Sequence, residues 1–226
     1  MTSIYQQALG EEFNRLHPQI QRRFGFSSAD GIASVGRGVM DRVWRSRFYT
    51  LPFLYIGTWR NIMFPENGRN IPFSIHNYAY PDQFGRETVT WVREFHLPHR
   101  TRRFDATMIY SERRGRIVDY LGNHQHLAVD IHLSVDDDGA MHLRSGAQRF
   151  YEGFIGFTFP MIFSGLADVR EWYDDSRGKF GIEVNVTNRW WGPLFGYTGY
   201  FDVEWIECRP EEVPSSVKPV REERRE

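Results

Sequence analysis

Apolar residues near the amino terminus recur with a helical period. Ser3 and Gln6 have the spacing of a capping box, which marks the start of a helix. The apolar stripe that follows consists of Tyr5, Leu9, Phe13, Leu16 and Ile20. His17-Pro18 interrupts this helix, because proline is tolerated only in a first turn, and a short second helix is expected after it. A further amphipathic stretch, formed by Val39, Met40, Val43 and Trp44, completes a predicted helical segment over residues 1–50.

The period changes to two after this segment, and the alternation predicts a β domain over residues 51–207. Residues 126–135 show it most clearly, with aliphatic side chains on one face and polar ones on the other. A short loop with Gly139 in the left-handed conformation pairs Val135 with Met141 and keeps the aliphatic residues together. Further candidate strands are 87–96, 103–111, 116–121, 179–188 and 197–206, with weaker ones at 53–64 and 71–80.

About eight to ten sequential strands with short connections predict a mainly β protein of the α+β type. An open meander of that length would expose long edges, so we expect an antiparallel barrel or a strongly curved sheet with the N-terminal helices packed on it. A short helix followed by a strand is expected over residues 160–175. Residues 208–226 are rich in proline and charge and contain no aromatic residue, which predicts a disordered tail.

Composition narrows the class of function. The chain has 226 residues, of which 41% are hydrophobic and 25% charged, and its formal net charge is −1. This balance argues against nucleic acid as a partner, because a nucleic-acid binder needs a basic stripe. Cys208 is the only cysteine, so neither an internal disulfide nor a cysteine-built zinc site is expected. Without a signal peptide or an apolar run of roughly 20 residues, we expect a cytoplasmic protein with no membrane span.

Short motifs of nucleotide binding and hydrolysis are missing from the sequence, so no cofactor is expected. His126, Asp130 and His132 share one polar strand face, which raises the question of a metal site. Residues two and four apart on a strand lie about 7 and 13 Å apart, however, which does not suit a single ion. We therefore expect no metal site on this face.

Three charged residues, Arg93, Asp119 and Glu171, each occupy a strand row whose other members are apolar. Burying a charge without a partner costs several kcal/mol, so each of these groups must pair or face a wet cavity. We therefore predict that Arg93 pairs with Asp119 or Glu171. Such a pair either ties strands together or anchors a ligand in a cavity.

A barrel with this number of strands is wide enough to hold one small molecule. The leading hypothesis is therefore a pocket for a small hydrophobic ligand of lipid-like, isoprenoid or polyketide type. Arg93, paired with Asp119, would anchor the polar end of this ligand. Trp91, Tyr110 and Tyr197 would form the walls.

Two other functions fit the same pattern. A cofactor-independent isomerase or cyclase would use Asp119 or Glu171 as a buried general acid. A protein-interaction module would instead have a filled barrel and an exposed aromatic patch near Trp190 and Trp191. Trp59 is a further aromatic candidate for the core or for a cavity wall. The oligomeric state stays open in all three hypotheses.

The order of several segments resembles the bacterial domain-of-unknown-function family 4166. The resembling segments are residues 4–18, 91–95, 119–122, 159–160 and 192–199, and the similarity extends over residues 3–205. The second of these segments contains Arg93, the residue that the facing argument also selects. Relatives resemble soluble bacterial proteins, sometimes associated with nucleotide-dependent oxidoreductase domains. The resemblance implies no established activity and no cofactor for this chain.

Overall fold

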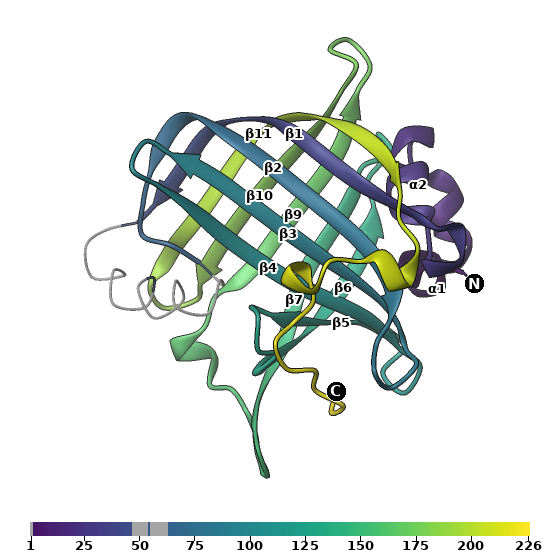
Figure 1. Cartoon of the computed structure of the whole chain (residues 1–226). Helices are drawn as coiled ribbons and strands as arrows, with labels where there is room; N and C mark the ends of the chain where they lie inside the picture. Colours follow the sequence, from purple (N-terminus) through teal and green to yellow (C-terminus); the bar gives the residue numbers. More distant parts are fainter. Residues whose placement is uncertain (1, 47–53, 55–62) are drawn as a thin grey trace.

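The computed structural model describes residues 2–46, 54 and 63–226, and the strands within them build an antiparallel barrel (Figure 1). The strands are β1 (Ile32–Arg45), β2 (Gly68–Pro81), β3 (Glu87–Leu97), β4 (Arg100–Ser111), β5 (Arg116–Leu121), β6 (Leu127–Val135), β7 (Met141–Glu152), β8 (Ile155–Thr158), β9 (Leu166–Asp174), β10 (Lys179–Asn188) and β11 (Gly192–Glu207). Their order is β6-β5-β4-β3-β2-β1-β11-β10-β9-β7, and β6 pairs with β7 to close the ring. The additional strand β8 pairs with β7. The mainly β, antiparallel barrel predicted from the alternation is therefore confirmed.

Short helices cover one end of the barrel (Figure 1). They are α1 (Ile4–Leu9), η1 (Gly10–Arg15), α2 (Pro18–Gly25) and η2 (Ser28–Asp30). The predicted capping box is present, because the side chains of Ser3 and Gln6 each accept a hydrogen bond from the other residue's backbone N–H. Apolar helix side chains such as Ile4, Ile20 and Phe24 belong to the same core cluster as the inner face of the strands. Burial of this stripe therefore fixes the helices on the barrel.

The β6–β7 hairpin adopts the predicted register. Val135 pairs with Met141, and His132 pairs with Arg144. In the connecting turn Gly139 has a φ of +78°, and a Cβ at this position would lie 2.7 Å from the backbone nitrogen of His17. That nitrogen donates a hydrogen bond of 2.9 Å to the carbonyl oxygen of Gly139. The glycine thus permits both the turn and the close approach of the chain just before α2.

The predicted helix around residues 39–44 is wrong, because this segment lies within β1. A β-bulge interrupts its pairing with β11 between Met40 and Arg42. As a result Met40 and Val43 are both buried, whereas Asp41 and Arg42 between them are exposed. A bulge therefore produces the three-residue apolar spacing that is typical of a helix. Barrel strands accordingly begin at Ile32, well before residue 51.

The segment after β8 agrees with the prediction of a short helix and a strand, since η4 (Met161–Phe163) precedes β9. Residues 208–226 differ from the predicted disordered tail. They contain η5 (Pro210–Glu212) and η6 (Ser215–Val217) and run along the outside of the barrel (Figure 1). The backbone N–H of Glu223 donates to Gln125 at 2.6 Å, and Arg86 donates to the Glu223 carbonyl oxygen at 2.8 Å. Charged side chains of this segment also contact the strand connections, since Glu226 pairs with Arg113 at 3.5 Å and Arg225 donates to the Gly153 carbonyl oxygen at 2.9 Å.

No helix in the described ranges has both the length and the apolar character needed to cross a membrane.

Candidate functional site

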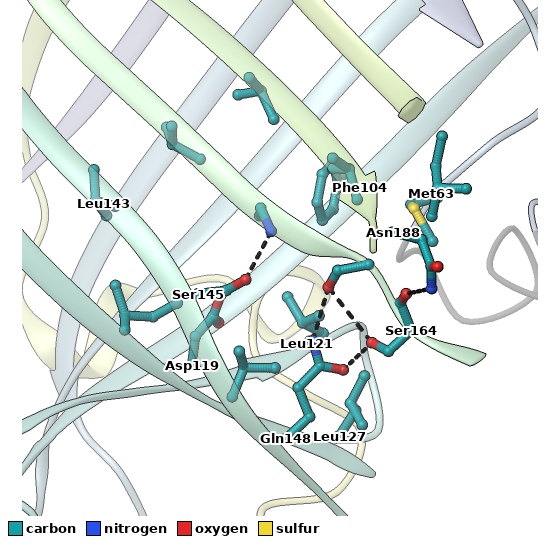
Figure 2. Close-up of a pocket in the computed structure, with 18 of the residues that line it drawn as sticks. Met63, Phe104, Asp119, Leu121, Leu127, Leu143, Ser145, Gln148, Ser164 and Asn188 are labelled. Atoms are coloured by element: carbon teal, nitrogen blue, oxygen red, sulfur yellow. Dashed lines mark hydrogen bonds between the residues drawn. The ribbon is translucent and has the colours of Figure 1, made fainter. Parts of the chain in front are cut away.

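A cavity of about 380 Å³ lies inside the barrel (Figure 2). Its lining reaches Leu121, Leu127 and Leu194, which stand at the strand ends away from the N-terminal helices. Most of the other lining side chains are apolar and come from both sides of the ring. Ligand pockets typically measure about 300–1,000 Å³, so this volume suits a small organic molecule. The protein-interaction hypothesis predicted a filled barrel, whereas the interior contains this cavity.

Arg93 lies on β3, lines the cavity and is only 4% exposed. Its guanidinium group stacks 3.8 Å from the ring centroid of Phe104, and its Nη1 donates a hydrogen bond of 3.3 Å to the Tyr197 hydroxyl. The Nε atom has no hydrogen-bond partner. The predicted ion pair of Arg93 with Asp119 or Glu171 is wrong, because no carboxylate lies within ion-pair distance of it in the described part of the chain. Aromatic rings surround the guanidinium group instead.

Asp119 lies on β5 and also lines the cavity (Figure 2). Burial raises the pKa of its carboxyl group to about 7, while the charge of Arg93 and a hydrogen bond from the Thr107 backbone lower it by less. Its Oδ1 atom has no hydrogen-bond partner. A carboxyl group that titrates near neutrality can hold or release a proton at ordinary pH, so Asp119 has the chemistry of an acid–base group as well as of a binding group.

Glu171, on β9, is fully buried but does not line the cavity. It forms an ion pair with Arg23 of α2, whose guanidinium also donates to the Ser34 hydroxyl at 2.8 Å. Burial raises the pKa of Glu171, and the charge of Arg23 opposes this rise. Glu171 is therefore neutralised at the end of the barrel that the helices cover. The Arg23–Glu171 ion pair therefore links α2 to β9 and has a structural role.

Polar side chains near the opposite end of the cavity bond to backbone carbonyl groups and, in one case, to each other. Gln148 donates to the Gly165 carbonyl oxygen at 2.8 Å, and Ser164 donates to the Gln148 side chain (Figure 2). Asn188 donates to the carbonyl oxygens of Met161 and Ile162 at 3.1 Å each. These bonds hold the segment around η4 across the rim of the barrel. They also leave the side chains of Gln148, Ser164 and Asn188 with hydrogen-bond partners inside the protein.

The predicted aromatic walls are only partly assembled. Trp91 lines the cavity, and Tyr197 lies beside it through its contact with Arg93. Tyr110 lines a different hollow, which it shares with Ile4 of α1 at the helical end. The structure therefore brings Trp91, Arg93 and Asp119 to one cavity, with Tyr197 behind Arg93, and leaves Tyr110 apart.

The two adjacent tryptophans stand in the turn that precedes β11. Trp190 is 56% exposed and Trp191 is 46% exposed. The indole of Trp191 also lines the cavity and donates a hydrogen bond of 3.0 Å to the Ile162 carbonyl oxygen. Trp59 lies outside the described residues, as does most of the weak candidate strand 53–64.

Sequence reasoning missed Arg23 and the Gln148–Ser164–Asn188 cluster. Arg23 carries a signal, because it stands three residues after Ile20 and just before Phe24, on the apolar face of α2. A charged residue on that face needs a buried partner. The polar cluster carries no comparable signal, since its members are far apart in the sequence and each is ordinary in its own context.

Metal-ligating residues do not gather anywhere in the described ranges in a group of three that could hold an ion. Two members of the strand face considered above point to separate partners. His126 contacts Glu152 at 2.7 Å, and His132 contacts Arg116 at 3.1 Å. The described part of the cavity lining contains one arginine, Arg93, and one carboxylate, Asp119.

A family model described as a domain of unknown function (DUF4166) matches residues 16–201 of the chain. The uncharacterized protein YndH of Bacillus subtilis (strain 168) is 30% identical over 204 residues, which cover 90% of this chain and 98% of YndH. No solved structure matches the chain significantly. These matches confirm the resemblance seen in the sequence.

Proposed function

The chain belongs to the domain-of-unknown-function family DUF4166, and from the chemistry of its cavity we propose that it binds a small, mostly apolar molecule with one polar end. The guest is of lipid-like, isoprenoid or polyketide type. Its apolar body contacts aliphatic walls such as Leu143 and Val184, and its polar end lies beside Arg93 and Asp119.

One observation carries this proposal. Arg93 and Asp119 both line the cavity, and each keeps a buried polar atom, Nε and Oδ1 respectively, without a hydrogen-bond partner. An unsatisfied buried polar atom costs about 1–3 kcal/mol. The other polar side chains of the lining, among them Gln148 and Asn188, are already hydrogen-bonded within the protein. A guest with a hydroxyl or protonated carboxyl end can accept from the Arg93 Nε–H and donate to the Asp119 Oδ1, and so supplies the partners that these two atoms lack.

Native mass spectrometry of the purified protein tests the proposal, because a guest that co-purifies appears as a second mass. Titration with a panel of fatty acids and isoprenoid alcohols, followed by tryptophan fluorescence, extends the test to guests lost in purification. Val184→Trp fills the cavity and should abolish binding, whereas Val39→Trp, on a side chain 42% exposed outside the barrel, should not. A protein that retains no guest and responds to no member of the panel would refute the proposal.

A second candidate function is a cofactor-independent isomerase on the same kind of molecule. It is favoured by the state of Asp119, whose pKa of about 7 allows it to give a proton to one atom of the substrate and to receive one from another. Glu171 is the weaker candidate acid, because Arg23 neutralises it. Asp119→Asn separates the two functions: an isomerase loses turnover while guest binding is retained, and a binding protein shows no turnover in either form.

A further inference from the structure

Exposed apolar side chains are concentrated at one end of the barrel. Ten large hydrophobic side chains are exposed among the described residues, and six of them come from the β7–β8 hairpin, η4 and the turn before β11. We call these six the mouth patch: Phe154, Ile155, Phe157, Ile162, Trp190 and Trp191. Phe154, at the tip of the hairpin, is 96% exposed. Apolar groups gathered in this way mark a contact surface more often than scattered ones do.

The mouth patch continues into the cavity. Ile162 and Trp191 belong to both, since each lines the cavity and is also exposed at the surface. The antiparallel ring places the end of β7, the start of β9 and the β10–β11 turn at the same end of the barrel, away from α1 and α2. The β7–β8 hairpin projects beyond the body of the barrel (Figure 1). An apolar path therefore leads from the outer surface to the cavity wall.

The chemistry of the patch fits a lipid bilayer. Residues 153–167 contain no charged side chain, although a quarter of the chain is charged. Arg225 donates hydrogen bonds to the carbonyl oxygens of Gly153 at 2.9 Å and Ile155 at 3.1 Å, so part of the backbone at the hairpin tip is already paired. Backbone groups must be satisfied before they enter an apolar phase. Exposed tryptophan and phenylalanine beside arginine is a combination typical of surfaces that enter the interfacial region of a membrane.

We propose that the mouth patch seats the open end of the barrel on a phospholipid bilayer, so that the guest passes between the membrane and the cavity without crossing water. The identity of the transferred guest rests on the proposed function, but the contact with lipid does not require a guest. Phe154 and Trp190 enter the interfacial region, and Arg189, which precedes Trp190 in the sequence, lies at the level of the lipid phosphates. Arg225, which binds the hairpin tip, is already paired with Glu223 at 2.8 Å.

Vesicle flotation with the full-length chain tests this contact. The probe is large unilamellar vesicles of phosphatidylcholine and phosphatidylglycerol, without added guest. The unchanged protein should float with the vesicles. The double variant Phe154→Ser, Trp190→Ser should bind at least about tenfold more weakly, because it no longer gains the free energy of moving two aromatic rings from water into the bilayer. Phe84→Ser is the matched control: this ring is 40% exposed in the β2–β3 turn, at the helical end, and its loss should leave flotation unchanged.

Three outcomes would overturn the inference. In the first, the unchanged protein does not float, and in the second, the double variant floats equally well. In the third, the mouth patch joins two copies of the chain. Sedimentation velocity without vesicles would then show a dimer that the double variant does not form. Urea unfolding of each variant checks that the fold is kept. Guest binding measured without vesicles is independent of these results: if it fails while flotation succeeds, only the proposed guest is refuted, and the reverse result refutes only the membrane contact.

Discussion

Replacement of Asp119 by asparagine should make the protein increasingly stable, relative to the unchanged chain, as the pH rises from about 4 to 8. Burial raises the pKa of this carboxyl group from its ordinary value of 3.8 to about 7. In the unfolded chain the group loses its proton near pH 4, whereas in the folded protein it keeps the proton until about pH 7. Ionisation of Asp119 therefore costs the folded state free energy. This cost is absent at low pH, grows as the pH rises from about 4 to about 7, and is constant above that range.

The size of the effect follows from the same two values. Each pKa unit corresponds to about 1.4 kcal/mol, so ionised Asp119 lowers the free energy of unfolding by about 4 kcal/mol at pH 8 relative to pH 4. Asp119→Asn cannot ionise and escapes this penalty. The difference in unfolding free energy between variant and unchanged protein should consequently rise by about that amount over the window. Any constant effect of the new amide cancels in the comparison between pH values.

Urea unfolding followed by tryptophan fluorescence, at several pH values between about 4 and 8, measures this difference. Asp137→Asn is the control, since its side chain is fully exposed and its replacement should leave the unfolding free energy nearly unchanged throughout. A difference for Asp119→Asn that does not vary with pH would show that the carboxyl group is not desolvated in the folded protein. The assignment of Asp119 as a near-neutral group in the cavity would then fail.

Two further substitutions probe the helical end. Glu171→Gln leaves the Arg23 guanidinium buried without its counter-charge and should lower the unfolding free energy by about 3–5 kcal/mol. The double variant Arg23→Met, Glu171→Leu should recover most of this loss; if it does not, the two charges do not act as a pair. Gly139→Ala should cost about 1–3 kcal/mol in thermal or urea unfolding, because its φ is +78° and the new methyl group meets the His17 backbone at 2.7 Å. Gly153→Ala, with a φ of +51° and no atom within 4 Å, should cost less, and an equal loss would mean that the His17 backbone yields freely.

The barrel was predictable because most of its strands carry their own evidence. Alternation over residues 126–135 and the glycine at 139 define the β6–β7 hairpin without reference to the rest of the chain. The strand predicted as a helix, β1, contains a bulge that places Met40 and Val43 on one face at helical spacing. Local periodicity cannot separate a bulged strand from a helix. Pairing of β1 with β2 and β11 decides the matter, and that pairing is a long-range property.

The site was predictable to the level of which residues face inward. Arg93, Asp119 and Glu171 are all buried, as their apolar rows predict. Their partners were not predictable, because the distance between two inward side chains depends on strand order and on what enters from outside the sheet. Arg23 of α2 forms the ion pair with Glu171. Arg93 therefore lies among aromatic rings, and Asp119 has no arginine contact among the described residues.

The position of β1 in the ring has a consequence for how the chain is made. Ile32 pairs with Glu207, so β1 receives one of its two neighbours only after 175 further residues have been synthesised and have left the ribosome. Contacts between such distant parts of a sequence are slow to form, since a long loop must close before they contribute. Until β11 emerges, β1 and β10 each present a bare edge to other nascent chains. Synthesis at low temperature or with chaperones that shield strand edges should therefore raise the yield of folded protein.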